Sequence, residues 1–158
     1  MALVFFGLMS AISMQAQTYD NAAGLRLGFG FGGTFKHFLN ESSALEAIVN
    51  IRGSGYLGYV SSRSIAISGL YEIHKPLDEV LEGLQWYVGG GALVGFSTSR
   101  VIGTRSSSAS FGILGVIGLD YAFEDIPLNI SVDWIPGIIF NGGGFTGDSG
   151  ALAVRYIF

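Results

Sequence analysis

The chain has 158 residues, of which 49% are hydrophobic and only 13% are charged, about half the charged share of an average soluble domain. This composition excludes a disordered chain, and 8 Lys and Arg against 12 Asp and Glu argue against nucleic-acid binding. The absence of cysteine excludes disulfides, zinc–thiolate sites, a cysteine nucleophile and a lipid-anchored cysteine.

The first apolar segment, residues 2–14, is uncharged but shorter than the roughly 20 residues that a membrane helix needs. It is typical of the apolar part of a signal peptide, so we expect residues 1–16 to be removed and residues 17–158 to form one domain. The alternative is a buried N-terminal strand or helix. No later segment could form a membrane helix, so a membrane form of this chain would have to be a closed β-barrel.

Apolar and polar residues alternate in segments of about ten residues after residue 17, and this period of two predicts strands. Eight such segments are predicted, at 22–28, 32–38, 43–52, 63–74, 84–96, 110–123, 128–135 and 151–158. The count depends on the sequence GFGFGG at 28–33. As a tight turn it gives eight strands, and as the middle of one long strand it gives seven.

Turns separate the predicted strands. Short turns are predicted at 40–42 and 124–127, a longer one at 76–83, and Gly-, Ser- and Thr-rich loops at 53–62, 97–108 and 141–149. Long loops that alternate with short periplasmic turns are typical of outer-membrane barrels. With an even number of strands, both chain ends lie on the periplasmic side. We therefore expect an all-β, eight-stranded, antiparallel up-and-down transmembrane barrel.

The two faces of the predicted strands differ sharply. One face carries Leu, Ile, Val and aromatic residues, and the other carries Gly, Ser, Ala, Asn and a few charges. The second face suits the interior of a narrow barrel, where buried charges must be paired. We expect a lumen ion-pair network of Arg26, Lys36, Glu46, Arg52, Glu72, Asp120, Asp133 and Arg155. The alternative is that these charges are scattered and solvated.

Aromatic residues collect near the predicted strand ends, as they do at the two interfaces of a membrane barrel. The predicted aromatic belts comprise Phe35, Tyr71, Trp86, Tyr121, Trp134, Phe96, Phe111 and Phe140.

The C-terminal strand is the most specific pattern. Leu152, Val154, Tyr156 and Phe158 alternate up to the last residue. This ending, together with the length and the alternation, resembles the small eight-stranded outer-membrane barrels of Gram-negative bacteria, of the OmpX/OmpA transmembrane-domain type. The resemblance implies residence in the outer membrane, contact with its lipid, and insertion by the barrel-assembly machinery, which reads this C-terminal signal.

Other motifs do not indicate catalysis. Residues 28–33 fit the spacing G-x-G-x-x-G, but a strand-like segment follows where a dinucleotide site needs a helix. His37 and His74 are predicted at the periplasmic interface, away from the serines at 106–108, which therefore have no nearby base. We expect no catalytic residue, no metal and no cofactor. An outer-membrane lipid hydrolase or acyltransferase that uses one of these histidines is a minor alternative.

The predicted role is structural, in envelope integrity or in surface interaction, with an unidentified ligand at the external loops and no nucleic acid as a partner. A filled lumen argues against a general porin, because open aqueous channels have about 16 strands or more. One alternative is a narrow pore for ions or small solutes. Another is a secreted, soluble, lipocalin-like barrel that binds an apolar ligand, with its apolar face turned inward.

Overall fold

The computed structural model describes residues 19–28, 30–56, 60–147 and 149–158, and the expected signal peptide at 1–16 lies outside them. The strands are β1 (Asn21–Gly28), β2 (Phe31–Asn40), β3 (Ser43–Tyr56), β4 (Val60–Pro76), β5 (Leu84–Val101), β6 (Thr104–Ala122), β7 (Leu128–Trp134), β8 (Gly137–Ile139), β9 (Gly144–Thr146) and β10 (Gly150–Ile157). Among the described residues, no helix is long and apolar enough to cross a membrane.

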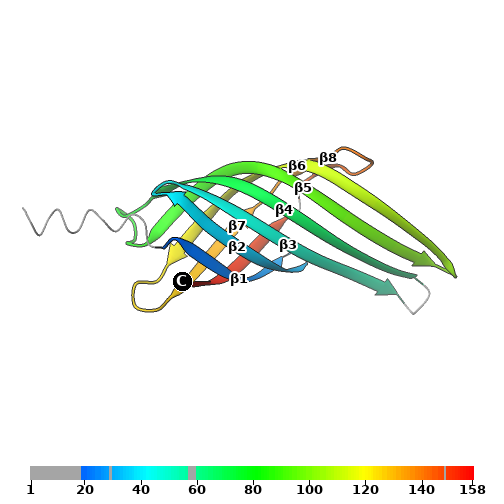
Figure 1. Cartoon of the computed structure of the whole chain (residues 1–158), viewed down its shortest axis with the longest axis horizontal. Coiled ribbons are helices and arrows are strands. Elements are labelled where there is room, and N and C mark those ends of the chain that lie inside the picture. The colour runs from blue at the N-terminus through cyan, green and yellow to red at the C-terminus, as the bar shows by residue number, and fades with distance from the viewer. Residues whose placement is uncertain (1–18, 29, 57–59, 148) are drawn as a thin grey trace, which may run out of the picture.

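The strands form one closed antiparallel barrel (Figure 1). From β1 to β7, each strand pairs with the next one in sequence, and β10 closes the ring by pairing with β1. β7 and β8 both pair with β6 and together occupy one of the eight strand positions around the barrel, which we call staves. This stave is interrupted where Pro136 has no N–H to donate. β9 and β10 make the eighth stave in the same way, beside β8 and β7. The predicted eight-stranded all-β barrel is confirmed.

The Gly-rich sequence at 28–33 is not the middle of one strand, because β1 ends at Gly28 and β2 begins at Phe31. Leu27 pairs with Phe31, and the Gly28 N–H donates to the Gly30 carbonyl at 3.1 Å. This tight connection lets β1 and β2 run antiparallel, as the eight-strand interpretation requires.

Two of the predicted loops are wrong. The ranges 53–62 and 97–108 lie mostly in strands, because β3 and β4 stay paired to Tyr56↔Val60, and β5 and β6 stay paired to Val101↔Thr104. Only Ile102 and Gly103 connect β5 to β6, and both have positive φ, 41° and 80°, as a two-residue type I′ turn demands. The ends of these four strands therefore project beyond the rest of the barrel (Figure 1). We call this part, residues 53–56, 60–63, 97–101 and 104–108, the protruding sheet.

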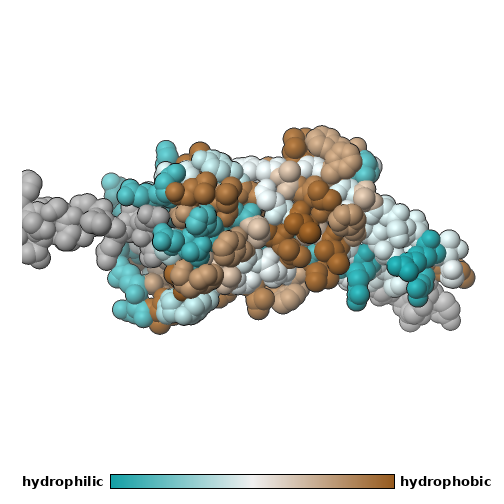
Figure 2. Space-filling model, in the orientation of Figure 1, coloured by the Kyte–Doolittle hydropathy of each residue, from teal (hydrophilic) through white to brown (hydrophobic). Residues whose placement is uncertain are grey.

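The apolar face of the strands points outward. Ile67 is 51% exposed, Leu119 43% and Val132 52%. Brown side chains gather on the middle of the barrel wall in Figure 2, whereas the protruding sheet is mostly white and teal. The reversed arrangement that a soluble, ligand-filled barrel would need, with the Leu, Ile and Val face inside, is therefore not the one this chain adopts.

Two small clusters of buried apolar side chains border the polar centre of the lumen, one on the side of the chain termini and one on the opposite side. Near the chain termini, Tyr19 and Phe38 pack edge to face, with ring centroids 5.0 Å apart. Toward the opposite end, Ile48, Leu70 and Val116 form a second buried cluster. The polar side chains between these clusters have little contact with water.

Gly118 on β6 leaves room for a long side chain of the neighbouring strand to lie across the inner face of the barrel wall. The register pairs it with Tyr87 on β5 and with Asp133 on β7. A Cβ atom at residue 118 would lie 2.7 Å from Tyr87 Cζ and 2.7 Å from Asp133 Cβ. Because residue 118 has no side chain, the Tyr87 ring lies across β6, and its hydroxyl donates to Asp133 Oδ2 at 2.7 Å.

Gly118→Ala should therefore lower the free energy of unfolding by about 1–3 kcal/mol, because the added methyl group displaces Tyr87. Gly69→Ala is the matched control, since a Cβ there has no atom within 4 Å, and it should change stability by less than about 1 kcal/mol. Urea unfolding of both variants, refolded in detergent micelles, checks this. Equal losses in the two variants would contradict the packing role of Gly118.

Candidate functional site

Seven charged side chains meet in the middle of the lumen, and each is at most 5% exposed. We call this group the ion layer. It consists of Arg26 on β1, Lys36 on β2, Glu46 on β3, Glu72 on β4, Asp120 on β6, Asp133 on β7 and Arg155 on β10. Every stave but β5 supplies a charge, and β5 supplies the Tyr87 hydroxyl. The layer therefore ties the whole circumference together.

Glu46 is the carboxylate with the most cationic neighbours. Its oxygens lie 3.4 Å from Lys36 Nζ and 4.0 Å from Arg26 Nη1, and it forms an ion pair with Arg155. The Thr34 hydroxyl also donates to it. Because its charge faces three cations, loss of Glu46 would leave several buried positive groups without their partner.

Lys36 bridges the opposite side of the layer. Its Nζ lies 2.8 Å from Glu72 Oε2 and 3.3 Å from Asp120 Oδ2. The same ammonium lies 4.2 Å from the centroid of the Tyr87 ring, which is within cation–π distance. One cation thus serves carboxylates from three staves.

The two arginines of the layer, Arg26 and Arg155, donate hydrogen bonds to different side chains. Arg26 donates from both Nη atoms to the Asp133 carboxylate, with Nη1 at 2.8 Å from Oδ2. Arg155 donates to Asn129 Oδ1 at 2.9 Å and to Ser131 Oγ at 2.8 Å, in addition to Glu46. Such paired, charge-assisted hydrogen bonds offset the desolvation of the buried ions.

His74 lies inside the barrel, and its prediction as an interface residue is wrong. It is 1% exposed, its Nε2 lies 3.0 Å from Glu72 Oε2, and its Nδ1 lies 3.1 Å from Gln85 Oε1. The signal was present in the sequence, because His74 is two residues from Glu72 and shares its inward face. The layer holds three cations against four carboxylates, and His74 lies beside one of these carboxylates, that of Glu72.

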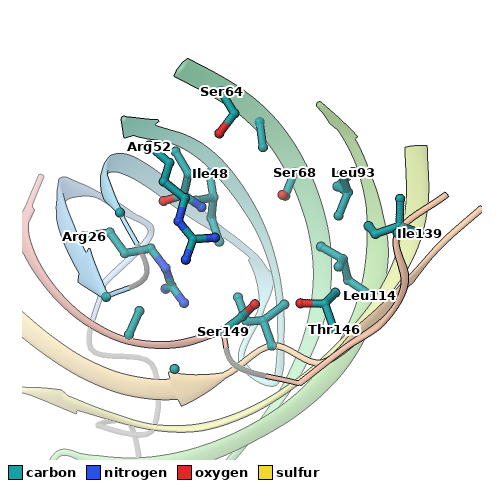
Figure 3. Close-up of a pocket in the computed structure, with 18 residues that line it drawn as sticks. Arg26, Ile48, Arg52, Ser64, Ser68, Leu93, Leu114, Ile139, Thr146 and Ser149 are labelled. Carbon is teal, nitrogen blue, oxygen red and sulfur yellow. The ribbon is translucent and has the colours of Figure 1, made fainter. Parts of the chain in front are cut away.

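Arg52 does not join the ion layer. It lies six residues beyond Glu46 on β3, about 20 Å along the strand, and is exposed. It lines a cavity of about 380 Å³ above the layer, where Arg26 forms part of the floor. In Figure 3, Arg26 and Arg52 point into this cavity from one side, and Leu93, Leu114 and Ile139 form the opposite wall. The polar passage is therefore open above the layer and filled at it.

The residues of the predicted aromatic belts lie on the outer face, near both ends of the strands. Toward the end that holds the chain termini, Phe35 and Tyr71 are exposed and Trp86 and Tyr121 are half-buried. Toward the other end, the exposed rings are those of Trp134, Phe96, Phe111 and Phe140. Phe111 and Phe140 contact each other across β6 and the turn after β8, with ring centroids 5.9 Å apart.

The C-terminal strand β10 completes the barrel. It pairs with β1 on one side and with β7 on the other. Leu152, Val154, Tyr156 and Phe158 all face outward and are 42–64% exposed. Phe158 also lies near Phe35, with ring centroids 6.5 Å apart.

The described residues bring together no nucleophile and base from the motifs considered above. His74 is enclosed by the ion layer, and His37 pairs with Asn21 at 2.9 Å near the chain termini. The serines at 106–108 lie in the protruding sheet at the opposite end. In the described part of the chain, no group of three or more His, Asp or Glu side chains could hold a metal ion. The ion layer fills the middle of the lumen and joins the strands around it.

Glu46→Gln and Glu72→Gln should differ although each removes one negative charge from the layer. Glu46→Gln separates three cations from their shared carboxylate and should lower the free energy of unfolding by about 3–5 kcal/mol. Glu72→Gln takes a carboxylate from Lys36, which keeps Glu46 and Asp120 as partners, and the amide oxygen remains an acceptor, so it should cost only about 1 kcal/mol. Urea unfolding of the two refolded variants measures both values, and a larger loss for Glu72→Gln would contradict this hierarchy.

No protein-family model and no curated protein sequence matches the chain. The solved structures that share its fold include three small β-barrels. The N-terminal β-barrel domain of Pseudomonas aeruginosa OprF is 15% identical, with a TM-score of 0.68 over 89% of this chain and 98% of that one. Neisserial surface protein A is 14% identical (TM-score 0.60, 87% and 94%), and so is Ail, the attachment invasion locus protein of Yersinia pestis (TM-score 0.54, 87% and 93%). The chain therefore has the fold of the small eight-stranded outer-membrane β-barrels.

Proposed function

We propose that the chain is an outer-membrane protein of a Gram-negative bacterium that contributes to envelope structure or surface interaction and does not conduct solutes freely. The observation that carries this proposal is the ion layer, which fills the lumen inside a wall whose outer face is apolar. A protein built in this way joins two sides of a membrane without opening a passage through it. No catalytic step is part of the proposed role.

Residence in the membrane is supported by the composition of the wall. Side chains such as Ile67, Leu119 and Val132 lie exposed on the outer face, where contact with hydrocarbon is favourable and contact with water is not. The closed ring of hydrogen-bonded strands leaves no free sheet edge at this level, which is the condition for β-structure in lipid. The aromatic side chains near both ends of the strands suit the two interfaces.

We infer that the outward residues of β10 act as the insertion signal. Leu152, Val154, Tyr156 and Phe158 present alternating apolar groups on the outer face. Before the barrel closes, both edges of this strand are unpaired and can be read by the barrel-assembly machinery, the partner that the resemblance implies. The short turns on the side of the chain termini would then face the periplasm, and the protruding sheet would face outward.

A role in surface interaction is supported by the protruding sheet. Its strands extend beyond the staves on the opposite side of the barrel, and its side chains are largely exposed (Figures 1 and 2). Among the proteins with this fold, Ail is described as an attachment invasion locus protein and has been crystallised with the heparin analogue sucrose octasulfate. The exposed side chains of the protruding sheet support a binding role for this chain at that end of the barrel.

A narrow pore is the second candidate, and the cavity above the ion layer favours it. About 380 Å³ of the lumen is already open there, so conduction would require that the ion layer and the buried cluster around Tyr19 and Phe38 part. The Arg26–Asp133 pair forms the boundary between the cavity and the layer. The closed barrel and the narrow pore differ in whether that boundary opens in the membrane without any substitution in the layer.

Planar-bilayer recording separates these candidates. The refolded protein should show no stable conductance steps, because the ion layer leaves no continuous water path. Lys36→Ala combined with Glu72→Ala removes one closely paired cation and carboxylate, 2.8 Å apart, and should raise the conductance by opening the layer. Both proteins must first show the same β-sheet circular dichroism spectrum.

The matched control is Ser62→Ala combined with Ser99→Ala, which removes a hydroxyl pair on the protruding sheet, away from the layer. This control should stay as silent as the unmodified protein. Stable conductance of the unmodified protein, unchanged by the double substitution in the layer, would contradict a closed lumen and favour the pore.

A further inference from the structure

Three of the eight cationic side chains lie together on the outer face of the protruding sheet. They are Arg63 on β4, Arg100 on β5 and Arg105 on β6, and all three are exposed. They line one shallow depression, with Ser61 and Thr98 between them. We call this group the arginine surface. The net charge of −4 for the whole chain conceals it.

The register holds the three arginines close to one another. Arg100 pairs directly with Arg105, and Arg63 pairs with Thr98, two residues from Arg100 on the same face. Residues directly opposite each other on antiparallel strands have Cβ atoms about 5 Å apart, and diagonal neighbours about 7–8 Å apart. Like charges in the direct position destabilise a sheet. An anion that binds between these guanidinium groups would remove that repulsion.

The arginine surface begins where the apolar wall ends. Ile65 and Phe96, which are 40% and 54% exposed, line the lower side of the same depression. Arg63 lies two residues beyond Ile65 and Arg100 four residues beyond Phe96, or about 7 and 13 Å along the strands. In a membrane whose hydrocarbon covers Ile65 and Phe96, the guanidinium groups would lie at the level of the lipid headgroups.

Carboxylates are distributed in the opposite sense. Residues 53–63 and 97–111 contain no Asp or Glu. Among the described residues, the exposed carboxylates lie at the end that holds the chain termini: Asp20, Glu41, Asp78, Glu79, Glu82, Glu124 and Asp125. This polarity along the barrel attracts anions to the protruding sheet and repels them from the other end.

We propose that the arginine surface binds the phosphate groups of the phosphorylated glycolipid in the outer leaflet of the membrane. A guanidinium group donates two parallel hydrogen bonds to a phosphate, which an ammonium group does not match. The Ser61 and Thr98 hydroxyls can donate to sugar or phosphate oxygens, and Ile65 and Phe96 contact the acyl chains of the same lipid. This apolar floor favours a lipid over a soluble polyanion. The inference rests on the proposed membrane residence and orientation.

The test measures binding of fluorescently labelled lipid A by the refolded protein in nonionic detergent micelles. Bisphosphorylated lipid A should bind more tightly than its dephosphorylated form. The triple variant Arg63→Gln, Arg100→Gln and Arg105→Gln should weaken binding of the bisphosphorylated form by about 100-fold, since each arginine near a lipid surface contributes about a tenfold effect or less. Its binding of the dephosphorylated form should not change.

Two control variants separate the contact from general charge. Lys75→Gln removes an exposed cation at the other end of the barrel, where Lys75 lies over the Trp86 ring, and should leave both affinities unchanged. Replacing the three arginines by lysine keeps the charge without the paired donors and should give an intermediate affinity. Equal binding of the two lipid A forms, or no loss in the glutamine triple variant, would overturn the inference. Binding of heparin to the same proteins is measured as well. A glutamine triple variant that loses binding to heparin but keeps its binding to lipid A would also overturn the inference, because the surface would then be assigned to a sulfated polysaccharide.

Cysteine labelling distinguishes failure of this inference from failure of the proposed function. The chain contains no cysteine, so Ser107→Cys and Glu79→Cys each introduce a single site. An impermeant maleimide should label Ser107→Cys in intact cells and Glu79→Cys only in permeabilised cells. The reverse pattern would place the arginines at the inner leaflet and overturn the inference while leaving a membrane barrel. Recovery of the protein in the soluble fraction would overturn the proposed function itself.

Discussion

The narrow lumen is the constraint on which the structure depends. Eight staves enclose a space just wide enough for side chains, so a charge that faces inward is removed from water and must find its partner across the barrel. Glu46 and Lys36 meet this requirement by each facing groups from several staves. The ion layer that results fills the middle of the lumen and links staves far apart in the sequence. The inward glycine at 118, the filled passage and the apolar exterior are consistent with this one arrangement.

The alternation of residues was enough to predict which way most side chains point. A period of two fixes the face of each residue once the strand is recognised, and Arg26, Lys36, Glu46, Glu72, Asp120, Asp133 and Arg155 all lie inside. The height at which each side chain meets the others could not be predicted, because it depends on strand tilt and stagger. Arg52 was for this reason expected in the ion layer although it lies above it, and His74 was expected at the interface although it lies beside Glu72.

The length of the protruding sheet was missed for a different reason. Runs of Ser, Thr and Gly were interpreted as loops, since they lack the apolar alternation of the wall. A signal was nevertheless present, because Thr98, Ser99 and Arg100 mirror Arg105, Ser106 and Ser107 about Ile102 and Gly103, as the register later pairs them. Outside the apolar layer, strands no longer need apolar residues. The same change in composition accounts for the arginines that the overall acidic balance conceals.

The apolar face surrounds a closed barrel that the ion layer holds together from inside. The most direct measurement is electrophoresis in SDS, with and without boiling, of protein extracted by detergent from the membrane fraction. A closed barrel should resist SDS at room temperature and migrate faster than the boiled chain. Identical migration of both samples, with the protein recovered from the soluble fraction, would contradict the outward apolar face and the closed barrel together.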